Sequence, residues 1–283
     1  MQITLDGNAH AALFDLPDND GAYSREQREY LGALGARRPA IVLAFPPKAA
    51  GTFLRTAAVK ATGGDVLRLG YAQGSRDAQL YLPTLIAYYL GGFCAGPLVA
   101  HIHMQAFPAN ISLLEALGIR PVIMLRGIAD MLASYWDMLE RSTAANQGIN
   151  CTIPGDFREI TPQRKADFLI DVIAPWYAGY YATWLDYARR AGDRVLLLDY
   201  SEFRNDPAGS LVRLLAHAGV PRDLPQCQAA IDAAWQERHG LRFNEGVDGR
   251  GYRYFSLGHM ERLNHLLSYY PATEPWRAEL AGL

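Results

Sequence analysis

The segment Ile41-Val-Leu-Ala-Phe45-Pro-Pro-Lys48-Ala-Ala-Gly51-Thr52-Phe53-Leu-Arg-Thr combines an apolar run, an abrupt turn and the start of a helix. The apolar run is typical of a strand that is covered on both faces of a sheet. A strand that ends at such a turn and leads into a helix leaves main-chain N–H groups pointing to one place, where they attract anions. Lys48 adds a positive charge and Thr52 a hydroxyl, so the turn predicts a phosphate or sulfate site. The alternative is a βα turn of similar composition that binds nothing.

The composition of the whole chain limits the classes of function. With 283 residues, of which 50% are hydrophobic, we expect one domain over 1–283, with a polar N-terminal extension over 1–39 that contains a short helix near 24–34. The formal net charge of −2 provides no overall basic field, so we do not expect nucleic acid as a partner. The first residues lack the features of a signal peptide, which predicts a cytoplasmic protein. Three widely spaced cysteines predict neither a disulfide framework nor a metal site.

One apolar segment raises the question of a membrane span. Residues 80–100 contain no charged side chain over 21 positions, which is long enough for a transmembrane helix. Pro83, Gly91-Gly92 and Gly96-Pro97 divide the segment into a short helix, a loop and the start of a strand. We therefore expect no transmembrane segment, and interpret these residues as a buried helix or as one wall of an apolar acceptor pocket.

Strands and helices alternate along the chain. Buried strands are predicted over 41–45, 98–103, 121–125 and 194–198, and 66–74 is either a strand or a loop. Helices are predicted over 51–61, 112–117, 128–141, 162–190 with an interruption at Pro175, 207–218 and 258–268. Long loops are predicted over 143–161 and 240–251. This order predicts an α/β fold of three layers, a mainly parallel central sheet flanked by helices, with ligands at the carboxyl ends of the strands.

The run Pro47-Lys48-Ala-Ala-Gly51-Thr52-Phe53-Leu54 resembles the phosphosulfate-binding loop of the sulfotransferases that use 3′-phosphoadenylyl sulfate (PAPS) as donor. The common form of that loop is Pro-Lys-Ser-Gly-Thr-Thr-Trp, and a variant, Pro-Lys-Thr-Ala-Gly-Thr-Ser, has its glycine where this chain has Gly51. The order differs from a Walker A loop, in which the lysine follows the glycines. The resemblance implies a P-loop NTPase-like sulfotransferase architecture. It also implies that the donor contacts Lys48, Ala49, Ala50, Gly51, Thr52 and Phe53.

Phe53 has two interpretations. By the resemblance it would stack on the adenine of the donor, where the family often has tryptophan. The alternative is a core residue in the first turn of the helix.

Arg126 follows the predicted strand 121–125, and Ser134 lies eight residues later, two turns along the next predicted helix. The family carries Arg-Asn-Pro-x-Asp-x-x-x-Ser-x-Tyr at this place, and Asp130 and Ser134 fit that pattern, while Gly127-Ile128 replaces Asn-Pro. The resemblance implies that Arg126 and Ser134 hold the 3′-phosphate of the donor. A guanidinium suits this task because it donates two parallel hydrogen bonds to a phosphate. Alternatively, Arg126 pairs with a structural carboxylate and Ser134 packs against the sheet.

Two histidines end the predicted strand 98–103. His103 lies 23 residues before Arg126, close to the interval at which the family has its catalytic histidine, and His101 stands where the family has lysine. The resemblance implies that His103 is the general base that takes the proton of the acceptor hydroxyl. Residues i and i+2 of a strand share a face, so either histidine is a candidate base. The alternative is a pair of hydrogen-bonded histidines in the core.

Two later segments carry weaker resemblance. Tyr200, in Leu198-Asp-Tyr200-Ser-Glu-Phe, is similar to the Tyr-Glu-Asp-Leu segment that helps to form the nucleotide pocket. The segment from Phe243 to Phe255 resembles Phe-Arg-Lys-Gly-x-x-Gly-Asp-Trp-Lys, which folds over the nucleotide, although Asn244-Glu245 replaces the Arg-Lys pair. Arg250 or Arg253 would then restore the positive charge, and small residues would let the backbone approach the nucleotide. The implied donor contacts here are Tyr200, Gly246, Arg250 and Gly251.

The resemblance as a whole implies transfer of a sulfonate group from PAPS to a hydroxyl, with release of adenosine 3′,5′-bisphosphate (PAP), by Lys48 and His103 as catalytic residues and without a metal. The apolar segment 80–100 and the aromatic region 176–187 favour a hydrophobic small molecule, a lipid or a natural product as acceptor, although these aromatic residues are alternatively core. Two other functions remain open: a P-loop-like kinase for a small molecule, which would need ATP and Mg²⁺, and a non-catalytic nucleotide-binding module.

Overall fold

The computed structural model describes residues 23–67, 79–90, 96–141, 153, 156–237 and 249–282. The elements that follow, and the contacts among them, belong to these ranges. Five strands form one parallel sheet in the order β2-β3-β1-β4-β5. The strands are β1 (Ala40–Leu43), β2 (Asp65–Leu67), β3 (Leu98–His101), β4 (Val122–Leu125) and β5 (Leu196–Asp199). The predicted α/β fold with a parallel central sheet is confirmed.

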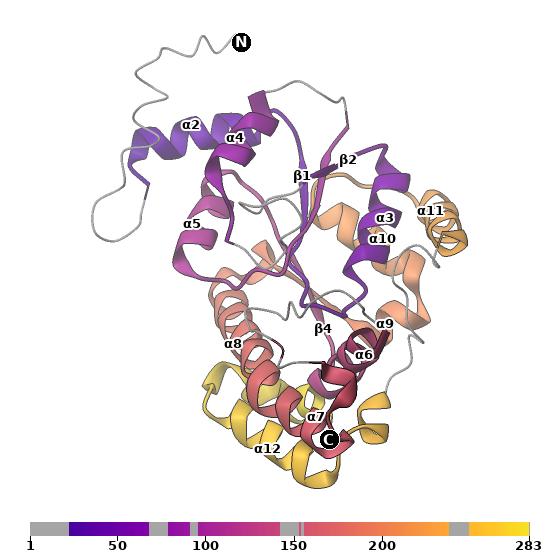
Figure 1. The fold of residues 1–283 in the computed structure, drawn as a ribbon. Helices are drawn as coiled ribbons and strands as arrows, with labels where there is room; N and C mark the ends of the chain where they lie inside the picture. The colour runs from indigo at the N-terminus through magenta and orange to yellow at the C-terminus, as the bar shows by residue number, and fades with distance from the viewer. Residues whose placement is uncertain are drawn as a thin grey trace.

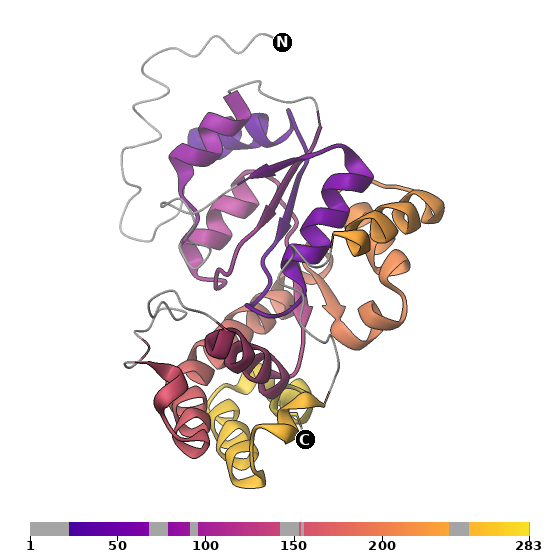
Figure 2. The same cartoon turned by 45° about the vertical axis from the view of Figure 1, so that its right-hand side comes forward.

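Helices cover both faces of this sheet (Figures 1 and 2). One face carries α3 (Gly51–Thr62), α10 (Pro207–His217) and α11 (Leu224–Gln236). The other face carries α2 (Arg25–Gly35), α4 (Leu82–Leu90) and α5 (Pro108–Ala116). The strands between these layers are covered on both sides, and all four residues of β1, β3 and β4 are buried. Burial on both faces explains why the sequences of β1, β3 and β4 are nearly continuous apolar runs.

A third group of helices gathers at the end of the sheet where α3 begins (Figure 1). It contains α6 (Ile128–Arg141), α7 (Pro162–Phe168), α8 (Ala174–Ala191), α12 (Leu257–Ser268) and α13 (Arg277–Ala281). A short helix, α9 (Tyr200–Asn205), follows β5 directly. The described ranges also contain short 3₁₀ turns, η1 (Phe157–Glu159), η3 (Gly192–Arg194), η5 (Arg250–Arg253) and η6 (Pro271–Trp276).

Several boundaries differ from those predicted. The strand predicted over 98–103 ends at His101, so His103 lies in the segment that follows the strand. The break in 162–190 is a π-helical turn, η2 (Leu169–Ile173), placed before Pro175; proline is tolerated there because it occupies the first turn of α8. In the apolar segment, α4 spans nine residues and β3 begins at Leu98, as the helix and strand start predicted there.

Candidate functional site

The order of the strands brings the predicted site residues to one edge of the sheet. Four neighbouring strands, β3, β1, β4 and β5, end there side by side. The ends of these strands and the segments that follow them carry, in the same order, the two histidines, the Lys48 turn, Arg126 and Tyr200. Residues that are far apart in the sequence therefore become neighbours because parallel strands end at a common edge.

The turn between β1 and α3 has an unusual backbone. Lys48 and Ala50 both have left-handed conformations, with φ of 67° and 60°. Ala50 is the N-cap of α3, and among the described residues no side chain caps this end of the helix. The first turn of a helix has main-chain N–H groups without partners in the helix, and the helix dipole adds a partial positive charge there. The turn therefore combines the features of an anion site with the charge of Lys48.

Arg126 lies against this turn. Its Nη1 donates a hydrogen bond to the main-chain carbonyl of Lys48, and its guanidinium carbon lies 3.9 Å from the centre of the Tyr200 ring. The residue is buried, and its Nε has no hydrogen-bond partner within the described ranges. Lys48, Arg126 and Tyr200 therefore form one cluster, in which the cation of Arg126 is held against an aromatic face.

One face of α6 holds the segment that contains η5. Asp130 accepts hydrogen bonds from the N–H groups of Gly249 and Gly251, both at 2.8 Å. One turn and two turns further along the helix are Ser134, which is buried, and Asp137, which binds Arg250 at 2.5 Å. Arg250 is itself only 2% exposed.

These contacts bear on the donor contacts that were predicted for Gly246, Arg250 and Gly251. The N–H of Gly251 already binds a carboxylate, and a side chain at Gly251 would collide with Ala129, 2.6 Å from the added Cβ. Arg250 is likewise engaged by an aspartate, while Arg253 is exposed. Contacts of Arg250 and Gly251 with a donor remain predictions, and Gly246 lies outside the described residues.

The two histidines lie together beside the turn. Their ring centres are 4.8 Å apart and the rings are nearly perpendicular. The ring of His101 is packed against Gly51, where an added Cβ would lie 2.1 Å from its Nε2. The Nδ1 of His103 lies 2.8 Å from the carbonyl oxygen of Phe45. Because a carbonyl only accepts, Nδ1 of His103 carries the hydrogen, and Nε2 is the acceptor atom of the neutral ring.

Phe53 belongs to an aromatic row that the sequence analysis did not foresee. Its ring centre lies 6.1 Å from that of Phe203 and 5.7 Å from that of Trp235, which it meets edge on. Phe53 is buried, whereas Trp235 is 45% exposed. Trp235 is thus the member of this row that presents an aromatic surface to the outside. It lies on α11, a helix that was not predicted.

The helix α8 supports the site from behind. The hydroxyl of Tyr177 donates to the carbonyl of Pro47 at 3.2 Å, and that of Tyr180 donates to the carbonyl of Ala44. Both residues are fully buried, and burial raises the pKa of Tyr180 well above its usual value, so its hydroxyl stays protonated. These two tyrosines fasten the turn that carries Lys48.

The same helix also binds the neighbouring segments. The hydroxyl of Tyr181 accepts from the N–H of Arg126 at 3.0 Å and donates to its carbonyl at 2.9 Å, and Nε1 of Trp184 donates to the carbonyl of Met104 at 2.9 Å. The aromatic residues of 176–187 at these positions are therefore core. The sequence carried a signal for this role, because tyrosine and tryptophan in a buried helix need hydrogen-bond partners that phenylalanine does not.

A pocket of about 220 Å³ opens beside Arg126, between β4, β5, α6 and η5. Its wall also contains Asp199 and Glu279. Asp199 caps α9 by accepting the N–H of Glu202 at 2.8 Å. Burial, and then a hydrogen bond with Asp199, raise the pKa of Glu279 above its ordinary value. Glu279 therefore holds its proton up to a higher pH than an isolated glutamate would.

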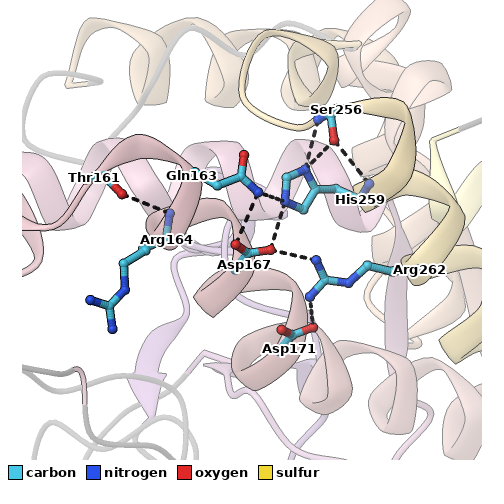
Figure 3. A network of polar contacts seen from close by, with 8 residues as sticks. All are labelled: Thr161, Gln163, Arg164, Asp167, Asp171, Ser256, His259 and Arg262. Atoms are coloured by element: carbon cyan, nitrogen blue, oxygen red, sulfur yellow. Dashed lines mark hydrogen bonds and ion pairs between the residues drawn. The ribbon is translucent and has the colours of Figure 1, made fainter.

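A serine, a histidine and an aspartate also come together away from the sheet (Figure 3). Nδ1 of His259 lies 2.7 Å from Oγ of Ser256 and its Nε2 lies 3.2 Å from a carboxylate oxygen of Asp167. Ser256 is the N-cap of α12, and His259 completes a capping box with it. Arg262 binds Asp167 as well, at 2.6 Å. We assign this network to the attachment of α12 to α7.

Two negative findings apply to the described part of the chain. No three His, Cys, Asp or Glu side chains come together there as a group that could hold a metal ion. None of the helices in those ranges is both long enough and apolar enough to cross a bilayer.

The comparisons with known proteins concern the fold. No protein-family model matches the sequence, and no curated protein matches it. The structure is similar to that of mouse sulfotransferase SULT7A1 complexed with PAP, with a TM-score of 0.61 and 15% sequence identity over 87% of this chain and 89% of that chain. A structure of retinol dehydratase with retinol and PAP matches at a TM-score of 0.43, with 14% identity over 87% of this chain and 86% of that chain. A second, with androsterone and PAP, matches at a TM-score of 0.37, with 14% identity over 66% of this chain and 56% of that chain. Both TM-scores are too low to support an argument. The chain therefore has the sulfotransferase fold.

Proposed function

We propose that this protein transfers a sulfonate group from PAPS to a hydroxyl of an acceptor and releases PAP. The observation that carries the proposal is the hydrogen bond from Arg126 to the carbonyl of Lys48. This contact brings the turn after β1 and the cation after β4 together, and a donor with anionic groups on two positions of its ribose would need both. The likeness in fold to a sulfotransferase that was solved with PAP supports the same proposal.

The residues of the site fit an anionic nucleotide. Nε of Arg126 is a buried donor with no partner among the described residues, and a phosphate oxygen would satisfy it. The uncapped first turn of α3 offers main-chain donors to a second anionic group. The exposed face of Trp235, in contact with Phe53, offers a stacking surface for a base. Lys48, Ser134 and Tyr200 complete the set of proposed donor contacts.

The proposed catalytic roles of the residues follow from these positions. The donor would supply an activated sulfonate group. His103 would take the proton of the acceptor hydroxyl through Nε2, because Nδ1 carries the hydrogen bound to Phe45. We propose His103 over His101 because His103 is the more exposed of the two, while the ring of His101 is buried against Gly51. Lys48 and the N–H groups of α3 would stabilise the negative charge that develops on oxygen.

The finer assignment of the acceptor as a hydrophobic hydroxyl compound has one supporting observation, in the segment that follows the histidines. Phe107, four residues after His103, is 41% exposed at the start of α5. An exposed aromatic ring in this segment would offer apolar contact to an acceptor. The buried aromatic residues of α8 do not contribute to this argument, since their hydroxyls and ring N–H groups are engaged by the core.

A thermal-shift experiment tests the donor. A ligand at about 100 times its Kd stabilises the folded state by about 2.7 kcal/mol, or roughly 5 to 10 °C in Tm for a chain of this size. We expect this shift with PAP and none with ATP and Mg²⁺. Arg126→Ala should weaken PAP by about 2 kcal/mol, close to thirtyfold in Kd, because a charged hydrogen-bond donor is lost. Arg190→Ala, which removes an exposed arginine of α8, is the matched control and should change nothing. A response to ATP but not to PAP would replace the proposal with a kinase.

A second experiment tests the base. His103→Ala should abolish transfer of labelled sulfonate while the Kd of PAP changes less than about twofold. His265→Ala, an exposed histidine of α12, serves as control. If PAP affinity collapses in His103→Ala, the histidine is structural and the proposed role is wrong.

A further inference from the structure

A second pocket, of about 180 Å³, lies at the opposite end of the sheet from the site described above. It opens at the amino ends of β1 and β4, where Ala40 and Arg120 line its wall. The carboxyl ends of three helices, α2, α5 and α10, surround it. Nothing in the proposed sulfonate transfer uses this pocket.

Three buried polar atoms in its wall have no hydrogen-bond partner within the described ranges. They are Nη1 of Arg38, the hydroxyl of Tyr89 and Nε2 of His217. The other donors of Arg38 are engaged, since Nε lies 3.1 Å from the carbonyl of Gly96 and Nη2 contacts the same oxygen. Tyr89 is only 4% exposed. Buried polar atoms are normally satisfied, so three orphans around one cavity indicate a ligand that satisfies them.

The protonation states of these groups define what the pocket offers. Burial raises the pKa of Tyr89 to about 12, so the hydroxyl keeps its proton and is a donor at neutral pH. Burial, together with the charge of Arg120, lowers the pKa of His217, so the ring is neutral at pH 7. His217 also donates to the carbonyl of Pro121, which leaves Nε2 as an acceptor. The wall therefore presents a cationic donor, a neutral donor and a neutral acceptor.

The charges in the wall select the ligand class. Arg38 and Arg120 carry full positive charges against the partial negative charges of the three helix ends, and neither of their carboxylate neighbours, Asp65 and Asp193, lines the pocket. We propose that this pocket binds a small oxyanion that carries a hydroxyl group, either hydrogen phosphate or a small hydroxycarboxylate. Its anionic oxygens would accept from Arg38 and Tyr89, and its hydroxyl would donate to His217. The position of this pocket at the opposite end of the sheet sets it apart from the one beside Arg126.

Isothermal titration of the full-length protein with inorganic phosphate, lactate and sulfate tests this assignment. Sulfate has no hydroxyl at neutral pH, so phosphate should bind at least about tenfold more tightly than sulfate. His217→Ala should remove this preference. Tyr89→Phe should weaken phosphate and lactate by about tenfold or more without lowering Tm, because the substitution removes an orphan hydroxyl and keeps the ring. Comparison of phosphate with lactate decides which of the two anions the pocket prefers.

The control separates this pocket from the proposed donor site. Arg126→Ala should leave intact the phosphate binding that Tyr89→Phe weakens, because Arg126 lies at the other end of the sheet. Three results would overturn the proposal: phosphate affinity that is unchanged in Tyr89→Phe, phosphate binding that is lost in Arg126→Ala, or no binding of phosphate and lactate below about 10 mM. PAP plays no part in these titrations. The anion-binding proposal can therefore be refuted without affecting the proposed sulfonate transfer, and a negative result with PAP does not affect the outcome of these titrations.

Discussion

Gly51→Ala probes the contact between the turn and the histidine pair. An added Cβ would lie 2.1 Å from Nε2 of His101, and 2.4 and 2.6 Å from two of its ring carbons. Carbon atoms do not approach ring atoms so closely, so the ring must move by about an ångström. It has little freedom to do so, because its centre is 4.8 Å from the ring of His103 and 6.3 Å from that of Phe45.

The expected loss of stability follows from two opposing effects. Overpacking of a buried contact costs about 1–3 kcal/mol. Replacing glycine by alanine inside a helix raises the free energy of unfolding by up to about 1 kcal/mol. The gain is smaller at the first helical position, where Gly51 lies. We therefore expect a net loss of about 1–2 kcal/mol, or about 2–8 °C in Tm. Sulfonate transfer should fall about a hundredfold, because the displaced ring of His101 pushes on His103, the proposed base, and a shift of about an ångström in a reacting group has that effect.

Urea unfolding and transfer assays of a double-mutant cycle provide the measurement. His101→Ala removes the ring that the new methyl group meets, so Gly51→Ala should cost almost nothing in that background. Gly32→Ala is the control, because its Cβ would find only the carbonyl of Ala116 at 3.6 Å, an ordinary contact, and the helix α2 should gain stability. The reasoning is refuted if Gly51→Ala is as stable as Gly32→Ala, or if its cost persists without the His101 ring.

Three further substitutions test other contacts. Asp137→Ala leaves the buried guanidinium of Arg250 without its carboxylate and should lower the free energy of unfolding by about 3–5 kcal/mol in urea; a loss under about 1 kcal/mol would mean that the pair is solvated. Tyr181→Phe leaves the buried N–H of Arg126 unpaired and should cost about 1–3 kcal/mol in the same assay, whereas an unchanged midpoint would contradict the contact. Burial raises the pKa of Glu279 above 4.5, so folding favours its protonated form and the free energy of unfolding should fall as pH rises through that pKa. Glu279→Gln should remove this fall and be the more stable protein at pH 7; identical pH profiles would show that the carboxyl is not perturbed.

The sequence predicted the elements that are buried on both faces and punctuated by glycine or proline. The strand over 41–45, the helix from Gly51 and the helix 128–141 were foreseen in type, and their boundaries were close to those of β1, α3 and α6. Each has a continuous or periodic apolar pattern together with a clear start or stop signal. Arg126 also meets the Lys48 turn, as a donor held by both residues would require, because β1 and β4 are neighbours in the sheet.

The contacts that fix the site were not predictable, because they depend on which surfaces meet. The helix α11 has a weak apolar pattern, rich in alanine and glutamine, so neither the helix nor the contact of Trp235 with Phe53 was foreseen. The tyrosines of α8 form a similar case: their spacing predicts a helix, but only the packing shows that their hydroxyls reach the backbone of the Lys48 turn. The engagement of Gly251 by Asp130 likewise joins two segments 121 residues apart.

The support that α8 provides explains how the turn keeps its backbone conformation. Left-handed φ at Lys48 and Ala50 costs about 1–2 kcal/mol for each residue, since neither is glycine. Three hydrogen bonds from Tyr177, Tyr180 and Arg126 reach carbonyls of this turn or its entry, and at about 1 kcal/mol each they are of the same size as that cost. The turn is therefore held in its strained shape by the core before any anion arrives. Binding of an anion there would cost little conformational entropy, because the loop is already ordered. Such preorganisation lets a cluster of main-chain donors bind an anion tightly.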